Sequence, residues 1–256
     1  MSNQTKIHSA LSEAMSARSY ITLTPVQEAI LKIEDTNSDL LVSAQTGSGK
    51  TLAFGISIAS TLLAEKMEFD RPKIPLAIII APTRELALQV RKELEWLYVR
   101  TKAQFASCVG GMDPRAERRT LESGAHIVVG TPGRIRDHIE RGVLRLSDIK
   151  AVVLDEADEM LDMGFKEDLE AILDSTPEEK QTLMFSATIP KTIAKLAKDY
   201  QKDAVRITIG KSNAQHVDIE YKAFKIVSSD QENAIITVSY THLRAHETRG
   251  NLVCRL

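Results

Sequence analysis

A glycine-rich loop between an apolar run and a helix-compatible run constrains the fold of this chain more than any other feature. The loop spans Ala44–Thr51, reads AQTGSGKT, follows Leu40–Val42 and precedes Leu52–Phe54. Glycines let successive backbone N–H groups turn toward an anion, and the N-terminal end of the following helix adds positive charge. The sequence therefore predicts a strand–loop–helix unit that holds phosphate groups, with Lys50 on the terminal phosphates and Thr51 on a magnesium ion. A chance Gly/Ser turn is the alternative, which the agreement between the loop and its flanks disfavours.

Composition indicates a globular protein and limits how it can contact nucleic acid. Hydrophobic residues make up 43% of the 256 residues, enough to bury a substantial core in one large or two small domains. The formal net charge is -2, so any contact with nucleic acid must use a local basic patch. Two cysteines without metal-ligand spacing, no apolar leader and no apolar run of about 18 residues predict a reduced, cytoplasmic protein without a membrane span.

Short apolar runs alternate with helical patterns along the chain. The runs lack polar alternation, which is typical of strands buried on both faces of a parallel sheet. We therefore expect an α/β fold, a parallel β-sheet with helices on both faces, and ligands at the carboxyl ends of the strands. The expected strands are Leu40–Val42, Leu76–Ile80, Phe105–Val109, Ile127–Val129, Ala151–Leu154, Thr182–Phe185 and Val205–Ile209. The expected helices after the phosphate loop are Leu86–Tyr98, Pro114–Leu121, Pro132–Arg141, Phe165–Leu173 and Ile193–Tyr200.

Two adjacent acids, Asp155 and Glu156, follow the expected strand at Ala151–Leu154. A carboxylate at the end of a buried strand is costly without a partner, and beside a phosphate loop its natural partner is magnesium. Asp155 is therefore a candidate metal ligand, partly through water. Glu156 is a candidate for orienting and deprotonating an attacking water. A helix N-terminus enriched in acids is the alternative interpretation.

Seven short motifs, in a fixed order, give the chain a specific resemblance to a known family. They are TPVQ at 24–27, the phosphate loop, PTRELA at 82–87, GG at 110–111, TPGR at 131–134, DEAD at 155–158 and SAT at 186–188. Over roughly residues 5–210 the chain resembles the first RecA-like lobe of DEAD-box ATP-dependent RNA helicases. The resemblance implies a RecA-like P-loop fold and an enzyme that couples ATP hydrolysis to local opening of RNA duplexes.

The resemblance also implies contacts with ATP and Mg²⁺. Gln27 is expected to select adenine, although on the residues alone an ordinary polar side chain of a helix is the better interpretation. Lys50, Asp155 and Glu156 are the expected catalytic residues, and Thr51 and Asp155 are expected to hold Mg²⁺, partly through water. The residues expected to contact ATP are Gln27, Ala44, Thr46, Gly47, Ser48, Gly49, Lys50 and Thr51.

Ala44 stands where the strict phosphate-loop pattern has its first glycine. Upstream of Gln27 the chain departs from the family pattern in two ways. Ser19 precedes Tyr20 where the family usually has glycine. No phenylalanine lies upstream, where the family usually stacks one on the base. We therefore expect adenine binding to be weaker or differently supported.

Loops at other strand ends are expected, by the same resemblance, to grip the backbone of single-stranded RNA with little sequence preference. Guanidinium groups, hydroxyls and exposed glycine amides suit phosphate oxygens, and the 2′-OH offers a way to choose RNA over DNA. Helix capping and surface ion pairing are the alternatives for the two arginines. The expected RNA-binding residues are Arg84, Gly110, Gly111, Thr131 and Arg134.

Asp158, Ser186 and Thr188 are expected to link the nucleotide site to the RNA site. The two hydroxyls are expected to bond to Asp155 or Asp158, and helix capping before Pro190 is the alternative. Other side chains are interpreted as structural or as part of a solvated helix face: His126, His138, Arg115, Arg118 and Arg119.

We expect a RecA-like ATP-binding domain at residues 1–209, and a linker with the start of a second lobe at 210–236. Residues 237–256 resemble a translated library adapter, which predicts a non-native or disordered tail; a natural extension is the alternative. The resemblance implies a monomer whose full-length parent carries a second RecA-like lobe that supplies arginines to the transferred phosphate. A binding module with little turnover and a DNA-directed translocase are the alternative functions.

Overall fold

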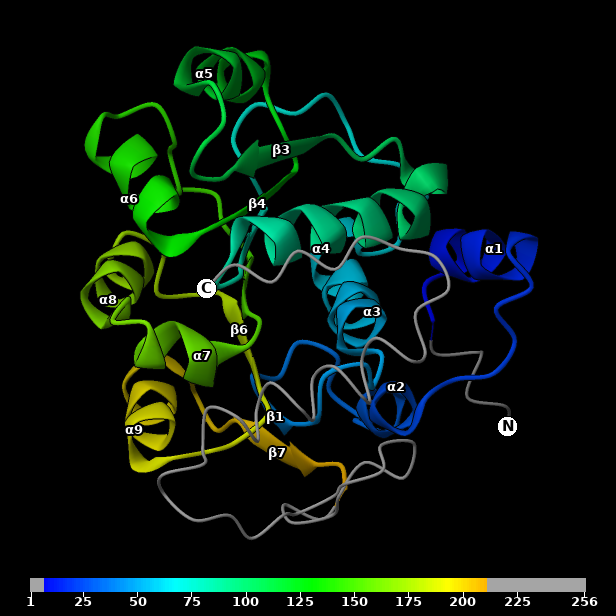
Figure 1. The fold of residues 1–256 in the computed structure, drawn as a ribbon. Coiled ribbons are helices and arrows are strands. Elements are labelled where there is room, and N and C mark those ends of the chain that lie inside the picture. The colour runs from blue at the N-terminus through cyan, green and yellow to red at the C-terminus, as the bar shows by residue number, and fades with distance from the viewer. Residues whose placement is uncertain (1–6, 211–256) are drawn as a thin grey trace, which may run out of the picture. The chain divides into compact units, whose positions relative to one another are not determined.

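Seven parallel strands, each close to one of the expected apolar runs, form a single sheet in the computed structural model (Figure 1). The structure describes residues 7–210, so the linker expected beyond Gly210 and the tail expected from residue 237 lie outside the described residues. The strands are β1 (Leu40–Ser43), β2 (Ala77–Ile80), β3 (Phe105–Cys108), β4 (Ile127–Gly130), β5 (Ala151–Leu154), β6 (Gln181–Ser186) and β7 (Val205–Thr208).

The strands do not lie side by side in chain order. From edge to edge the order is β3-β4-β2-β5-β6-β1-β7, and every neighbouring pair is parallel. Near the middle, Ile80 at the end of β2 lies opposite Gly130 of β4 and Leu154 of β5. Because all strands run the same way, their carboxyl ends lie along one edge of the sheet, and the loops with the sequence motifs leave from that edge.

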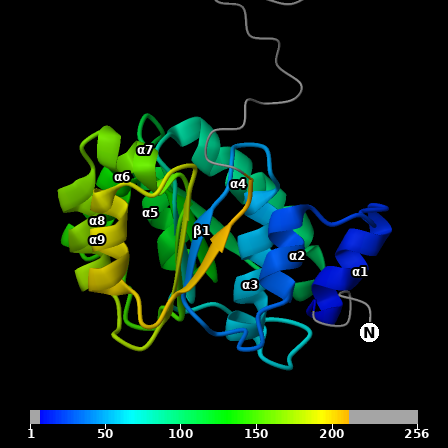
Figure 2. The same cartoon turned by 90° about the horizontal axis from the view of Figure 1, so that it is seen from below.

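Helices cover both faces of the sheet, as the sequence predicts for an α/β fold. Figure 2 shows the sheet between the two helical layers. One layer contains α1 (Ser9–Ala17), α2 (Pro25–Leu31), α3 (Lys50–Leu63), α4 (Arg84–Leu97) and the 3-10 helix η2 (Val99–Thr101). The other contains α5 (Pro114–Ser123), α6 (Pro132–Glu140), α7 (Ala157–Asp162), α8 (Lys166–Asp174) and α9 (Lys191–Tyr200).

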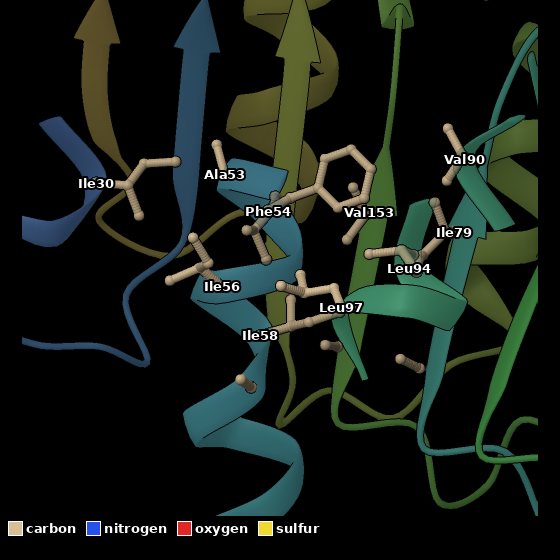
Figure 3. Packing of buried hydrophobic residues seen from close by; sticks show 14 of the residues in the cluster. Ile30, Ala53, Phe54, Ile56, Ile58, Ile79, Val90, Leu94, Leu97 and Val153 are labelled. Carbon is tan, nitrogen blue, oxygen red and sulfur yellow. The ribbon is translucent and has the colours of Figure 1, made fainter. Parts of the chain in front are cut away.

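Alternate residues of each strand pack against opposite helical layers. Ile79 of β2 belongs to the cluster beneath α3 and α4, whereas its neighbours Ile78 and Ile80 belong to the cluster beneath α5–α9. The first cluster contains Phe54 of α3, whose ring contacts Phe185 of β6 edge to face with centroids 5.5 Å apart. Figure 3 shows side chains of α3 and α4 meeting over the strands in this cluster. Burying each such large apolar side chain contributes about 1.5–3 kcal/mol, so both layers are held firmly to the sheet.

Glycine allows α3 and α4 to approach each other closely. A Cβ added at Gly55 would lie 2.7 Å from Leu94 Cδ2 and 2.8 Å from Leu97 Cδ2. The Tyr98 hydroxyl donates to the Gly55 carbonyl oxygen at 2.7 Å. This contact fixes α3, and therefore the phosphate loop at its start, against the helix that follows β2.

Two helices were not expected from the sequence. α1 buries Ala10, Leu11, Ala14 and Met15 on one face, so a helical spacing of apolar residues was present as a signal. α7 has only six residues and begins inside the acidic DEAD segment, where polar residues mask any periodicity. Within the described residues, no helix combines the length and the apolar character that crossing a membrane requires.

Candidate functional site

The order of the strands divides the motif-bearing edge of the sheet into two halves. Loops after β3, β4 and β2 carry the expected RNA-binding residues, and loops after β5, β6 and β1 carry the phosphate loop, the acids and the SAT segment. β2 and β5 are neighbours at the boundary between the halves. The fold therefore brings together residues that the sequence separates by more than a hundred positions, and it sorts them by expected ligand.

The phosphate loop has the backbone that its glycines predict. Gly47 and Gly49 have φ angles of 80° and 84°, in the left-handed region that favours glycine, and Gly49 is the N-cap of α3. A Cβ at Gly47 would meet no atom within 4 Å, so the space above the loop is open. The Ser48 hydroxyl is buried without a hydrogen-bond partner among the described residues. A loop with open space at Gly47 and backbone amides at a helix N-terminus suits a phosphate chain.

Lys50 points back into the loop that it follows. Its side chain is 6% exposed, and its ammonium lies 3.4 Å from the Ala44 carbonyl oxygen and 3.8 Å from Glu156 Oε1. The Thr46 hydroxyl also contacts Glu156 Oε1, at 3.4 Å. The Glu156 carboxylate, in the DEAD segment, thus lies against the phosphate loop, although Glu156 and the loop are far apart in the sequence.

Asp155 is a buried carboxylate at the end of β5. It is 2% exposed, and burial raises its pKa to about 6, while the nearby Lys50 ammonium opposes that rise. Its Oδ1 accepts a hydrogen bond from the Glu156 amide at 3.1 Å. Glu156 has a φ of 52°, a strained conformation for a residue with a side chain, and such strain is common where a side chain is aimed for function.

Gln27 is part of the wall of the phosphate loop. It is 1% exposed, its Oε1 accepts from the Thr24 amide at 3.0 Å, and its Nε2 donates to the Gly49 carbonyl oxygen at 3.1 Å. The Tyr20 hydroxyl lies 3.1 Å from Nε2 and 3.2 Å from Oε1. Ser19 has a φ of 56°, so it adopts the conformation that suits the glycine usual at its position.

The expected RNA-binding residues come together from three loops. The Arg84 Nη1 group donates to the Gly111 carbonyl oxygen at 3.2 Å, and the Arg134 Nη2 group donates to the Met112 carbonyl oxygen at the same distance. Arg84, Gly110 and Gly111 are exposed, while Thr131 is half-buried at the start of α6. The Thr131 hydroxyl makes no capping hydrogen bond to the first turn of α6. The arrangement presents guanidinium, hydroxyl and glycine amide groups along one edge, the groups that bind phosphate oxygens.

A buried acid that the sequence did not single out organises this surface. Glu117 of α5 is 5% exposed; its Oε2 lies 2.7 Å from Arg134 Nε and 2.8 Å from His138 Nε2, and its Oε1 accepts from the Val109 amide at 2.9 Å. It therefore ties the Gly110-Gly111 loop to α6. The structural interpretation of His138 agrees with this contact. Glu117 was missed because it lies among the charged residues of α5, where no sequence signal distinguishes a buried acid from exposed ones.

Hydrogen bonds connect the DEAD segment to the SAT segment. The Thr188 hydroxyl and amide both donate to Asp158 Oδ2, at 2.8 and 2.9 Å, and Ser186 Oγ accepts from the Asp158 amide at 3.3 Å. Partial burial raises the pKa of Asp158, but hydrogen bonds from Ser186 and Thr188 outweigh it and leave the pKa below the usual value. Of the two acids considered from sequence, Asp158 is thus the partner of these residues.

A model of the DEAD/DEAH box helicase family matches residues 24–196. The chain belongs to this family. Its sheet, with the phosphate loop after β1 and the DEAD segment after β5, is the RecA-like lobe of a DEAD-box protein.

Curated DEAD-box relatives cover most of the chain. It is 39% identical over 244 residues to the DEAD-box ATP-dependent RNA helicase CshA of Bacillus licheniformis, an alignment that covers 95% of this chain and 45% of the relative. It is 45% identical over 198 residues to the DEAD-box ATP-dependent RNA helicase 53 of Oryza sativa subsp. japonica, covering 77% and 32%. The chain therefore spans half or less of the length of these relatives.

A solved DEAD-box structure has the same fold. The crystal structure of a DEAD box protein from the hyperthermophile Methanococcus jannaschii superposes with a TM-score of 0.72 at 36% sequence identity, covering 91% of this chain and 61% of the other. The RecA-like fold expected from the motifs is therefore confirmed. No group of three or more His, Cys, Asp or Glu side chains positioned to hold a metal occurs within residues 7–210.

Proposed function

We propose that this chain is the ATP- and RNA-binding lobe of an ATP-dependent RNA helicase. The observation that supports this most is the division of the sheet edge, which gathers phosphate-binding and acidic groups in one half and arginines and glycine amides in the other. The Asp158–Thr188 contact joins the loops after β5 and β6, both of which belong to the nucleotide half of the edge. RNA backbone contact without base readout fits the little sequence preference expected of such an enzyme.

In this proposal ATP replaces Glu156 as the partner of Lys50. The ammonium already lies inside the loop, 3.8 Å from the Glu156 carboxylate. Terminal phosphates carry more negative charge than one carboxylate, so they compete for the ammonium and for the Thr46 hydroxyl. Glu156 is then released to orient and deprotonate the attacking water.

Mg²⁺ suits the oxygen donors of Thr51 and Asp155, and we propose that these two residues hold it, partly through water. Hydroxyl and carboxylate oxygens are the ligands this ion prefers. Asp155 is buried, and burial raises its pKa to about 6, so a bound cation would hold the carboxylate in its ionised form. When bound, the ion neutralises negative charge on the transferred phosphate.

Adenine selection by Gln27 requires an exchange of hydrogen bonds. The Gln27 amide is already engaged by Thr24, Gly49 and Tyr20. We propose that the base takes the place of the Tyr20 hydroxyl, while the bond to Gly49 keeps Gln27 in contact with the phosphate loop. The side chain would then transmit the presence of adenine to the loop that holds the phosphates.

The residues proposed to bind the RNA backbone are Arg84, Gly110, Gly111, Thr131 and Arg134. Complete duplex opening is proposed for the longer protein, in which a second RecA-like lobe adds arginines beside the transferred phosphate. A monomeric state and a cytoplasmic location stay predictions. A lobe that binds without turnover is the alternative for the chain as it stands, and a DNA-directed translocase is the alternative for its nucleic-acid partner.

Separate loss of the two binding activities tests the proposal. In the 256-residue chain, Lys50→Ala is expected to weaken ATP binding at least tenfold, since a hydrogen bond to a charged group contributes about 1.5–3 kcal/mol, and to leave RNA binding unchanged. Arg84→Ala is expected to weaken RNA binding and to leave ATP binding unchanged. Calorimetric titration with MgATP and fluorescence anisotropy with single-stranded RNA measure the two effects.

Matched DNA serves as the control for the choice of nucleic acid. RNA is expected to bind more tightly than DNA of the same sequence, because only RNA offers the 2′-OH. Undiminished ATP binding by the Lys50→Ala chain would contradict the proposed nucleotide site. Equal affinity for RNA and DNA would favour the translocase alternative.

A further inference from the structure

A basic cavity lies between α5 and α6 and extends from the edge of the sheet where both helices begin toward the opposite edge, where residues 73–75 precede β2. Its volume is about 690 Å³, and its walls come from both helices, from the loop at residues 141–145 after α6 and from residues 73–75 before β2. We call it the α5–α6 cavity. The phosphate loop and the DEAD segment contribute no residue to its lining, so it is separate from the proposed ATP site.

The lining of the α5–α6 cavity is strongly positive, although the chain as a whole carries a formal charge of -2. Two acids line it, Glu122 and Asp137. Its six cationic side chains are Lys73, Arg115, Arg118, Arg134, Arg141 and Arg145. A concave surface lined by one sign of charge concentrates the electrostatic potential inside it and attracts ions of opposite charge.

Half of these cations are balanced by acids and half are not. Arg118 pairs with Glu122 at 2.7 Å, Arg141 with Asp137 at 2.6 Å, and Arg134 with Glu117 at 2.7 Å. Within the described residues, ion pairs are absent for the other three, which are Lys73, Arg115 and Arg145. Three positive charges without acidic partners around one cavity repel each other, and this repulsion lowers the stability of the fold in the absence of a bound anion. Their arrangement favours a negatively charged ligand.

The position of the cavity indicates which anion it meets. α5 begins at Pro114, directly after the Gly110-Gly111 loop, and Arg134 lines the cavity while contacting the Met112 carbonyl oxygen of that same loop. A strand of RNA bound along the Arg84–Gly111 edge therefore meets the end of the cavity that Arg115 and Arg134 line. Lys73 and Arg145 precede β2 and β5 and lie further along the cavity, toward the opposite edge of the sheet. Arginine forks match phosphate oxygens, which are the charged groups such a strand carries.

We propose that the α5–α6 cavity binds phosphates of the RNA strand where it continues past the Gly110-Gly111 loop. This inference rests on the proposed function, because it extends the RNA path on the same lobe. It assigns phosphate contacts to Lys73, Arg115 and Arg145, three cations that no family motif includes. Arg115, interpreted from sequence as part of a solvated face, becomes an RNA ligand.

Salt dependence of RNA binding tests the proposal on the 256-residue chain. The triple variant Lys73→Ala/Arg115→Ala/Arg145→Ala is compared with Arg119→Ala, a matched control on α5 whose exposed side chain lies outside the cavity lining. Single-stranded binding loses about 0.7 in the slope of log K against log salt for each phosphate contact. We expect the triple variant to lose about 1.4–2 from that slope, and the control to lose none. Fluorescence anisotropy with a labelled oligouridylate long enough to pass both surfaces provides the measurement.

Three further readouts separate the possible results. Thermal melting and MgATP affinity equal to those of the unmodified chain show that the triple variant is folded. A slope and an affinity equal to those of Arg119→Ala would overturn the inference while RNA binding stands, whereas no RNA binding by the unmodified chain would overturn the proposed function as well. Titration with tripolyphosphate alone identifies the phosphate source. Tight tripolyphosphate binding that the triple variant loses, with the RNA slope unchanged, would overturn the assignment to RNA.

Discussion

Asp155 is a residue whose surroundings oppose its own charge. Burial raises its pKa to about 6, above its unfolded value near 3.9, so the native state binds more protons than the unfolded state between about pH 4 and pH 6. The contribution of Asp155 to stability is therefore full below about pH 4 and is lost as the pH rises through about 6. The ionised Asp155 carboxylate thus lowers the stability of the protein at neutral pH when no cation is bound.

Asp155→Asn is expected to stabilise the ligand-free chain at pH 7 by about 1–3 kcal/mol, since one pKa unit corresponds to about 1.4 kcal/mol. The gain should disappear near pH 4, where the native aspartate is already neutral. Urea unfolding in EDTA at pH 4, 5.5 and 7 measures this dependence. A constant difference between the two proteins at all three pH values would contradict the burial argument.

Gly49 and Gly47 share a left-handed backbone but differ in their surroundings. A Cβ added at Gly49 would lie 2.7 Å from Gln27 Nε2 and 2.9 Å from Thr24 Oγ1, whereas a Cβ added at Gly47 would have no atom within 4 Å. Gly47→Ala is expected to cost about 1–2 kcal/mol from backbone strain alone. Gly49→Ala should cost more and also weaken ATP binding, because Gln27 must move. Urea unfolding and MgATP titration of both variants provide the comparison. Equal losses of unfolding free energy in the two variants would show that Gln27 can move aside without an energetic penalty.

At the residue scale, the motifs predict which segments share one edge of the sheet but not which side chains contact each other. The contact between Lys50 and Glu156 was not predicted, because it depends on the order of the strands. The engagement of Gln27 with Gly49 and Tyr20 was not predicted either, because it depends on how α2 packs against the phosphate loop. Glu117 was hidden for the same reason, since burial on a charged helix is decided by its neighbours.

Among the secondary-structure elements, β3, α5 and α6 act as one unit through Glu117. Its carboxylate bonds to Arg134, His138 and the Val109 amide. Glu117→Ala leaves a buried histidine and a mostly buried arginine without their acid. Removing one partner of a buried pair costs about 3–5 kcal/mol, and we expect a loss near the lower end because Arg134 keeps some exposure.

RNA affinity is expected to fall with Glu117→Ala while MgATP affinity is retained. The contacts of Glu117 position only the half of the sheet edge that carries the proposed RNA-binding residues. Glu122→Ala is the matched control on α5: its pair with Arg118 is exposed, so it should change stability by less than about 1 kcal/mol. Chemical denaturation and the two binding titrations measure these effects. An equal loss of ATP affinity would show that the network extends across the whole edge.

The elements themselves were largely predictable, because buried parallel strands read as short apolar runs and helical patterns lie between these runs. Capping residues mark some of the helix starts: Thr83 accepts a hydrogen bond from the Leu86 amide at the start of α4. α7 escaped prediction since it is too short for periodicity. The order of the strands was not predictable, because it depends on pairings between distant segments that leave no local trace.

At the scale of the whole molecule, the chain carries one lobe of the proposed RNA helicase. We expect it to bind MgATP and RNA but to hydrolyse ATP slowly, and a longer protein with a second RecA-like lobe to turn over at least about 10³-fold faster in the presence of RNA, by analogy with arginine fingers in other NTPases. Phosphate release with and without RNA measures this, with Lys50→Ala as the blank. Comparable rates for the two proteins would place all catalytic groups within this lobe.

The position of β1 in the sheet has a consequence for synthesis on the ribosome. Within residues 7–210, β1 pairs only with β6 and β7, and Leu40 faces Leu183, more than a hundred residues further along the chain. At about 5–20 residues per second, roughly 7–30 s separate the synthesis of β1 from that of its partner β6, while β2, β3, β4 and β5 can already pair among themselves. We therefore expect ATP to assist folding of the nascent chain only after β6 has been synthesised, because the strand that leads into the phosphate loop has no partner before then.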